Sequence, residues 1–227
     1  MLARAIVALL VLLLGYTLSI AVRTGLADVY AEPAKGFLQG KRDAREVLTR
    51  DEWQAIYDGL SQALVLAPGD PENISQLGRL HRILLEPDDL DAGQISRYGD
   101  AATSYYQAAL ALRPTWPWDW GDLARVKYEQ YQDAGSVYQG ALVRAVEFGP
   151  QEALLQDQIA ELGMDSWPVL SPAVALAVLS AAERALERDA QSLPWTSDAK
   201  ERWQPLCARA GDSFVHLKRR CESLGLT

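Results

Sequence analysis

Apolar residues recur with helical spacing along most of the chain. Residues 51–67 and 71–85 each place their apolar positions on one helical face. The same spacing predicts further helices over residues 99–113, 117–132, 136–148, 151–162 and 173–190. Alternating runs of β-branched residues, the pattern of a half-buried strand, are nearly absent. The pattern therefore predicts an all-α fold.

One joint between two helices is repeated along the chain. Residues 109–126 (ALALRPTWPWDWGDLARV) contain a helix ending, a short turn and a new helical start. Pro114 cannot continue the first helix, whereas Pro117 fits the first turn of the second. Residues 63–80 match this stretch at a shift of 46 residues, and residues 145–162 match it at a shift of 36. Repeated helix–turn–helix joints predict a helical solenoid.

The residues of this joint resemble the tetratricopeptide repeat, a helix pair of about 34 residues. Trp120, Leu123 and Ala124 match the large, leucine and small positions of its first helix, and Pro114 matches its closing proline. The resemblance covers residues 51–190. It implies a short right-handed α-solenoid of tetratricopeptide-like helix pairs.

The spacing of the copies and the end of the chain depart from a plain repeat. A shift of 46 rather than about 34 residues implies an insertion, which we expect in the polar, turn-rich residues 86–97. Residues 191–227 are expected to hold a C-terminal capping helix, begun by Ser197 or Asp198 as N-cap. Such a helix would seal the open face of the last repeat.

The N-terminal segment reads as a membrane anchor. Residues 5–22 are 18 residues without a charge, just long enough to span a bilayer. A cleaved signal peptide is the alternative, with small-residue sites at Ala27 and Ala31, but its apolar core is usually shorter. We therefore expect a transmembrane anchor at residues 1–23, followed by a linker or lead-in at residues 24–50.

The anchor suggests a location for the repeat domain. The short N-terminus is easily left in the cytoplasm, which would place the repeats in the periplasm, on a single-pass anchor in a bacterial inner membrane. A second apolar run, residues 169–182, is only 14 residues long before it meets Glu183 and Arg184. A second membrane span is therefore not expected.

The two cysteines, Cys207 and Cys221, lie within the final predicted helix. On one straight helix they would be about 21 Å apart, whereas the Cα atoms of a disulfide lie within about 7 Å. Two free thiols are therefore the favoured interpretation. A bend at Gly211 would allow a disulfide, which would fit an oxidising compartment.

Composition and motifs argue against most catalytic and nucleic-acid functions. The net charge of −8 over 227 residues opposes binding to a phosphate backbone. His81 and His216 belong to no metal-ligand spacing, and no phosphate loop or nucleophile motif occurs. Asp88, Asp89 and Asp91 lack the spacing and glycine of a calcium loop. We therefore expect no enzymatic activity, no cofactor and no metal.

The repeat resemblance also implies a binding groove, because the first helices of such repeats line the concave face. Its register predicts these partner-binding residues: Arg79, Arg82, Trp118, Arg125 and Tyr128. The same register places on this face Glu72, Ser75, Gly121, Leu154, Asp157, Glu161 and Met164. Arginine forks pair with carboxylates and aromatic rings offer apolar surface, so an anionic peptide or glycan would suit the groove. The alternative is that both rings are packed inside and the arginines are merely solvated.

A second resemblance concerns function. The anchor, the short repeat array and the joint at residues 113–127 (RPTWPWDWGDLARVK) resemble the small VpsP-type proteins of bacterial exopolysaccharide biosynthesis. Similar joints occur in the helical tails of membrane polysaccharide polymerases and ligases. The resemblance implies a membrane-anchored scaffold or accessory protein in exopolysaccharide biosynthesis or export, whose partners are other proteins of a membrane polysaccharide-assembly complex.

Two other functions stay open at this point. One is an envelope chaperone-like repeat module for protein secretion or cell-division assembly. The other is a glycan-binding or glycan-active protein, in which a groove carboxylate such as Glu72 or Glu161 would act.

Overall fold

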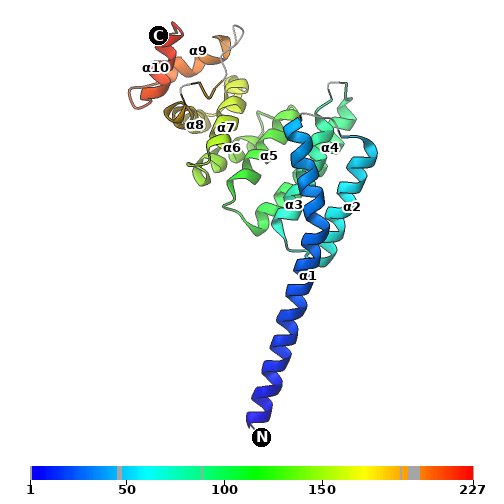
Figure 1. Cartoon of the computed structure of the whole chain (residues 1–227). Helices are drawn as coiled ribbons and strands as arrows, with labels where there is room; N and C mark the ends of the chain where they lie inside the picture. Colours follow the sequence, from blue (N-terminus) through cyan, green and yellow to red (C-terminus); the bar gives the residue numbers. More distant parts are fainter. Residues whose placement is uncertain (1, 45–47, 88, 190, 194–199, 227) are drawn as a thin grey trace. The chain divides into compact units, whose positions relative to one another are not determined.

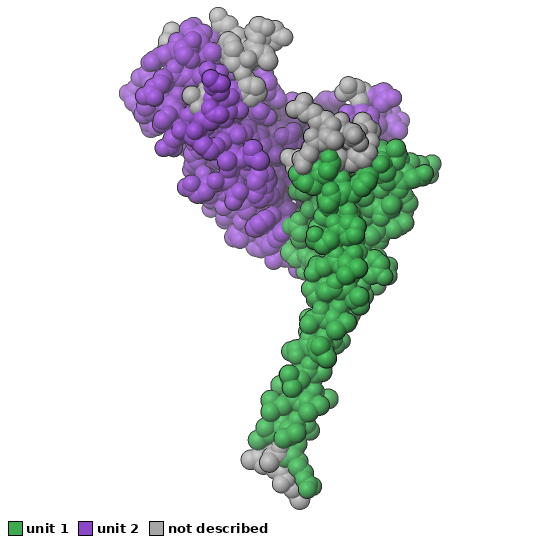
Figure 2. All heavy atoms as spheres, viewed as in Figure 1, with its two compact units in different colours: residues 1–80 green, residues 81–227 purple. Residues whose placement is uncertain are grey.

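Figure 1 shows a computed structural model in which the regular elements of the described residues are all helical, as predicted for an all-α fold. The structure describes residues 2–44, 48–87, 89–189, 191–193 and 200–226. The chain divides into two compact units, residues 1–80 and 81–227 (Figure 2). The boundary falls inside the range 51–190 that was expected for the repeats.

The first helix, α1 (Leu2–Ala44), runs for 43 residues and continues through Pro33. Side chains from residues 4–26 are exposed, and this half of the helix protrudes from the rest of unit 1 (Figure 2). Among the described residues, α1 is the one helix long and apolar enough to cross a membrane, with a mean hydropathy of 2.6 over its best 18-residue window.

The expected linker at residues 24–50 is instead helical as far as Ala44. Pro33 lies on the exposed face of α1, whereas the opposite face packs on α2 (Arg50–Leu66). The buried residues of α1 recur every three or four positions: Ala27, Ala31, Ala34 and Leu38. On α2 the buried residues are Ile56, Leu60 and Ala63. This packing holds residues 27–38 as part of one helix despite the proline.

Small residues let α1 and α2 approach closely. A Cβ atom built on Gly59 of α2 would lie 3.0 Å from the carbonyl oxygen of Tyr30. The next helix of unit 1, α3 (Pro71–Arg82), is tied to α2 by Trp53, whose indole N–H donates to the carbonyl oxygen of Leu80 at 3.1 Å. Unit 1 is therefore held by close helix packing and by a specific indole hydrogen bond.

Unit 2 begins in the last turn of α3, which passes into the 3₁₀ turn η1 (Ile83–Leu85). The helices that follow are α4 (Ala92–Leu112), α5 (Pro117–Glu129), α6 (Ser136–Phe148), α7 (Ala153–Asp165) and, after the 3₁₀ turn η2 (Trp167–Val169), α8 (Pro172–Arg188). Each of these helices contacts the next, α5 also contacts α7, and α6 also contacts α8. Contacts to first and second neighbours are expected for stacked helix pairs. The right-handed solenoid itself stays a prediction.

Helix α4 begins seven residues before its predicted start at residue 99. Asp91 caps it reciprocally with Gln94: the Asp91 carboxylate accepts from the Gln94 N–H at 2.8 Å, and the Gln94 side chain accepts from the Asp91 N–H at 2.9 Å. The expected insertion at residues 86–97 is therefore helical from Ala92 onward. Its polar composition reflects an exposed first turn rather than a loop.

The alanine-rich helix α8 is part of the hydrophobic core of unit 2. It packs against α7, where a Cβ atom on Gly163 would lie 2.3 Å from Val178 Cγ2. Val178, Ala181 and Ala185 are fully buried. The apolar character of residues 169–182 is thus explained by packing inside the protein.

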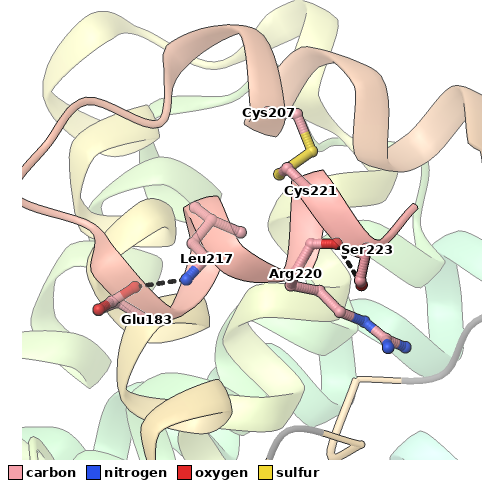
Figure 3. Close-up of a disulfide and its surroundings, with 6 residues drawn as sticks. All are labelled: Glu183, Cys207, Leu217, Arg220, Cys221 and Ser223. Carbon is pink, nitrogen blue, oxygen red and sulfur yellow. Dashed lines mark hydrogen bonds between the residues drawn. A yellow bond between two sulfur atoms is a disulfide. The ribbon is translucent and has the colours of Figure 1, made fainter. Parts of the chain in front are cut away.

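The expected single C-terminal helix is two helices, α9 (Lys200–Arg209) and α10 (Val215–Ser223). They contact α7 and α8 respectively and add Trp203, Leu206 and Leu217 to the core of unit 2. The carboxylate of Glu183 on α8 caps the first turn of α10. Its two oxygens accept the backbone N–H of His216 at 2.8 Å and that of Leu217 at 2.7 Å. Figure 3 shows the bond to Leu217. The expected N-caps, Ser197 and Asp198, lie outside the described residues.

The favoured interpretation of two free cysteines is wrong. Cys207 and Cys221 form a disulfide between α9 and α10, with their Cα atoms 5.6 Å apart (Figure 3). The straight-helix distance does not apply, because the chain turns between Arg209 and Val215 and brings the second helix back beside the first.

We predict that replacing both cysteines, Cys207→Ser with Cys221→Ser, lowers the free energy of unfolding of unit 2 by about 3 kcal/mol, because the bridge closes a loop of roughly 15 residues. Urea denaturation of the detergent-solubilised full chain, followed by tryptophan fluorescence, measures this change. Ser223→Ala on the exposed side of α10 is the control. An unchanged midpoint in the double variant would contradict the prediction.

Candidate functional site

The predicted groove residues fall in both units. Arg79 lies in unit 1, where its guanidinium donates to the side chain of Gln76 at 3.4 Å. Arg82, Trp118, Arg125 and Tyr128 lie in unit 2. The chain divides into two units, so we describe the four residues of unit 2 by themselves. Their contacts determine whether their side chains are available to a partner.

Arg82 is held by carboxylates of its own unit. Its guanidinium donates to Glu129 at 2.9 Å and lies 3.6 Å from Glu86, and the side chains of Arg82 and Glu129 are only 18 and 20% exposed. Burial, the largest single influence, works against the charged guanidinium, but the negative groups around it, Glu129 foremost, together outweigh burial and raise the pKa of Arg82. Arg82 therefore acts first as a structural partner for Glu129.

Arg125 sits between two acidic side chains on neighbouring helices. Burial raises the pKa of Glu129 on α5 and of Glu161 on α7, and Arg125 partly offsets both shifts by favouring the charged carboxylates. No ion pair within 4.0 Å joins Arg125 to another described residue. Arg125 is thus the predicted groove arginine in unit 2 with the greatest freedom to meet an external anion.

The two aromatic residues of the predicted groove are half-buried, and each lies near an acidic side chain. The indole N–H of Trp118 donates to Glu152 at 3.3 Å. Burial, followed by the nearby carboxylate of Asp165, raises the pKa of the Tyr128 phenol. Asp165 is also ion-paired with Arg202 of α9. Both rings therefore belong partly to the interior.

Tyr128 also lines a cavity of about 500 Å³ at the C-terminal end of α5, whose polar wall is acidic. The acidic residues are Glu129, Asp133 and Asp165, and the apolar ones include Leu85, Leu90 and Ile95. Among the described residues no group of three His, Cys, Asp or Glu side chains is placed to hold a metal ion. Of the aspartates weighed as a cation site, Asp91 caps α4 and Asp88 lies outside the described residues.

Several other positions that the register placed on the groove are buried, whereas Leu154 is 69% exposed. Ser75 and Met164 are 2 and 4% exposed, and a Cβ on Gly121 would lie 2.4 Å from Leu155 Cδ1. Asp157 is ion-paired with Arg188 at 2.9 Å. The register therefore locates the helices well but overstates how much of their face is accessible, and partner binding by the five predicted residues stays a prediction.

A cavity that the sequence pattern did not reveal lies between α4, α5 and α6. Its volume is also about 500 Å³. Its floor is apolar and includes the buried side chains of Leu110, Leu123 and Ala141. The half-buried ring of Trp120 forms one wall. The repeated joint at residues 109–126 thus supplies a large part of this cavity.

The joint is locked by polar contacts that position Trp120. The Arg113 guanidinium binds both carboxylate oxygens of Asp119, at 2.9 and 3.2 Å, and Asp119 is 3% exposed. Arg113 also lies over the ring of Trp116, 4.9 Å from its centroid. The indole N–H of Trp120 donates to the carbonyl oxygen of Pro114 at 2.8 Å. Trp120, which the repeat pattern assigned to the core, is half-buried: it packs against the core and also lines the cavity.

No protein-family model matches the chain, and no curated protein matches it significantly. Function must therefore be argued from the geometry of the chain itself.

We predict that Arg113→Ala lowers the free energy of unfolding by about 3–5 kcal/mol, because it removes the guanidinium charge and its two hydrogen bonds from the buried Asp119 carboxylate. Urea denaturation of the full chain in detergent measures the loss. Arg144→Ala, at an exposed position on α6, is the control and should change stability by less than about 0.5 kcal/mol. Equal stability of the two variants would refute a structural role for the pair.

The raised pKa values of Glu129 and Glu161 predict a pH dependence of stability. Their folded-state pKa values lie above the ordinary value of 4.5, so the folded state holds the protons more tightly. Their contribution to stability is therefore present below pH 4.5 and is lost as the pH rises through the raised pKa values. Glutamine does not titrate, so Glu129→Gln lacks the contribution of Glu129 to this pH dependence. As the pH rises from 4.5 to 7, wild type should therefore lose stability relative to Glu129→Gln. Denaturation at constant ionic strength tests this, with the exposed Glu147→Gln as control; a shift in favour of wild type would contradict it.

Proposed function

We propose that the protein is a membrane-anchored helical scaffold that holds partner proteins at a bacterial membrane. One observation carries the proposal: α1 joins an exposed apolar half to a half that packs on α2, without a break. Residues 5–22 are about 27 Å long as a helix, close to the thickness of a bilayer core. The anchor and unit 1 thus share one helix, which suits a protein that fixes the position of others.

Burial at the possible cleavage sites supports a retained anchor. Ala27 and Ala31 are the small residues at which a signal peptide would be cut, and they are 1 and 0% exposed. Both lie within α1, in the stripe that packs on α2. Cleavage at either site would remove part of the packed stripe together with the apolar segment. A retained anchor keeps unit 1 whole.

The disulfide between α9 and α10 supports the proposed location of unit 2. Disulfides persist in oxidising compartments such as the bacterial periplasm and are rare in the cytosol. A single anchor with its short N-terminus in the cytoplasm would put unit 2 and the packed part of unit 1, which follows the anchor, in the periplasm at the inner membrane. We propose this topology.

The proposed process is exopolysaccharide biosynthesis or export, and it rests on the resemblance of the joint at residues 113–127 to VpsP-type proteins. In this proposal the partners are other proteins of a membrane polysaccharide-assembly complex. The five predicted groove residues would contribute to their capture, with Arg125 as the principal contact for an anionic segment.

We predict that affinity capture of the full chain from detergent-solubilised membranes recovers glycosyltransferase or chain-export proteins. Arg125→Glu should reduce their recovery at least about tenfold, because it reverses the charge that has no close partner. Arg219→Glu, an exposed arginine on α10, should leave recovery unchanged. The intact mass of the captured chain should include the residues before Ala27.

Other outcomes would favour the alternatives. Recovery of secretion or division proteins in place of polysaccharide enzymes would indicate a chaperone-like envelope module. Glycan cleavage by the purified chain, lost in Glu161→Gln, would indicate a glycan-active protein. A mass that begins at residue 28 or 32 would show that the anchor is cut.

A further inference from the structure

The cavity between α4, α5 and α6 has the features of a binding site rather than of a packing defect. Its volume of about 500 Å³ lies within the range of about 300–1,000 Å³ typical of ligand pockets. Its floor is buried and apolar, whereas the residues of its rim, among them Gln107, Val137 and Arg144, are exposed. It therefore opens to solvent above an apolar base.

Two small, exposed residues, Gly140 and Ala111, border the cavity at its mouth. Gly140 stands in the interior of α6, where glycine is less favourable than alanine. A Cβ atom built on Gly140 would meet no atom within 4 Å. Ala111 lines the cavity from the opposite helix, α4. Because both positions are exposed, larger side chains there can extend across the mouth of the cavity without displacing the core.

An available positive charge stands at the rim. Arg144 is exposed, lies over the ring of Phe148 at 5.6 Å, and has no carboxylate of a described residue within 4.0 Å. It differs in this from Arg113, Arg188 and Arg202, which are all ion-paired. On a chain with a net charge of −8, an unpaired arginine beside an apolar cavity favours a ligand that is apolar and anionic.

We propose that this cavity binds a bulky apolar side chain of a partner protein, with a neighbouring carboxylate of the same segment on Arg144. The inference rests on the proposed scaffold function, since it takes the occupant from a partner protein. Tryptophan and arginine, the residues of the wall and the rim, are the most enriched at energetic centres of protein interfaces. Gln107 and Ser136 at the rim can bond the partner's backbone.

The test uses a defined probe, the fluorescein-labelled peptide Gly-Ser-Gly-Phe-Asp with a free carboxyl end. Its binding to the full chain in detergent micelles is followed by fluorescence anisotropy. We expect saturable binding that becomes at least about tenfold weaker in Gly140→Leu, which extends across the mouth of the cavity, and in Arg144→Glu, which reverses the charge. Arg144→Lys should bind more tightly than Arg144→Glu.

Matched controls separate the cavity from general effects. Gly36→Leu replaces an exposed helical glycine of α1 that also has nothing within 4 Å of a Cβ, and it should bind the peptide like wild type. The peptide Gly-Ser-Gly-Ser-Asp, which lacks the apolar side chain, should not bind. Ala111→Leu extends across the mouth from the other wall, and melting curves of each variant check that it is folded. If Gly140→Leu or Ala111→Leu unfolds, the comparison of Arg144→Glu with Arg144→Lys still decides the outcome.

Several results would overturn the proposal. The first is absence of binding, and the second is binding that Gly140→Leu and Arg144→Glu leave unchanged. The third is binding of a fatty-acid probe, 11-(dansylamino)undecanoic acid, in the absence of peptide binding. If Gly140→Leu abolishes binding of that probe, the cavity is a lipid site. The fourth is a dimer in light scattering that Gly140→Leu disrupts, again without peptide binding, which would make the occupant a second copy of this chain.

The affinity capture distinguishes failure of this inference from failure of the scaffold function. If Gly140→Leu still captures the polysaccharide-assembly proteins as wild type does, the scaffold function stands and the cavity is not its docking site. If the peptide binds the cavity but wild type captures no such proteins, the cavity site stands and the scaffold function fails.

Discussion

The bend between α4 and α5 depends on the buried ion pair between Arg113 and Asp119. A carboxylate that is 3% exposed requires a partner, and Arg113 supplies two hydrogen bonds while its other face lies over Trp116. The pair fixes where α5 begins relative to the end of α4, and the indole hydrogen bond from Trp120 to Pro114 then sets one wall of the neighbouring cavity. The joint therefore fixes the packing of α4 against α5. Through Trp120 it also lines the candidate docking site.

Charges in unit 2 are balanced mainly within the chain. Arg82 with Glu129, Arg188 with Asp157 and Arg202 with Asp165 join helices that are far apart in sequence. These pairs hold Arg82, Arg188 and Arg202 inside the protein's own network, and partner binding by the predicted groove stays a prediction. Arg125 and Arg144 differ from their neighbours, because neither makes an ion pair with a described residue. They mark two surfaces, one beside α7 and one at the cavity of α6.

The N-terminal and C-terminal parts of the chain are held in place by different interactions. At the N-terminal end, a stripe of alanines lets α1 lie close to α2, so that the apolar segment continues directly into a packed helix. At the C-terminal end, α9 and α10 cover α7 and α8, held by a disulfide and by a carboxylate of α8 that caps α10. A rigid attachment at one end and a covalently closed cap at the other are consistent with the proposed extracytoplasmic scaffold.

The sequence by itself determined the all-helical class, the apolar anchor segment and most helix limits, because period, prolines and caps are local signals. Helix α6 spans residues 136–148 as its pattern predicts, and α2 and α8 agree within two residues at each end. Only the tertiary structure decided the rest. The course of α1 through Pro33, the pairing of Cys207 with Cys221, the burial of Gln156 where a tryptophan stands in the preceding copy, and the cavity at Gly140 all depend on which surfaces meet. Such meetings join residues distant along the chain, and no local pattern encodes them.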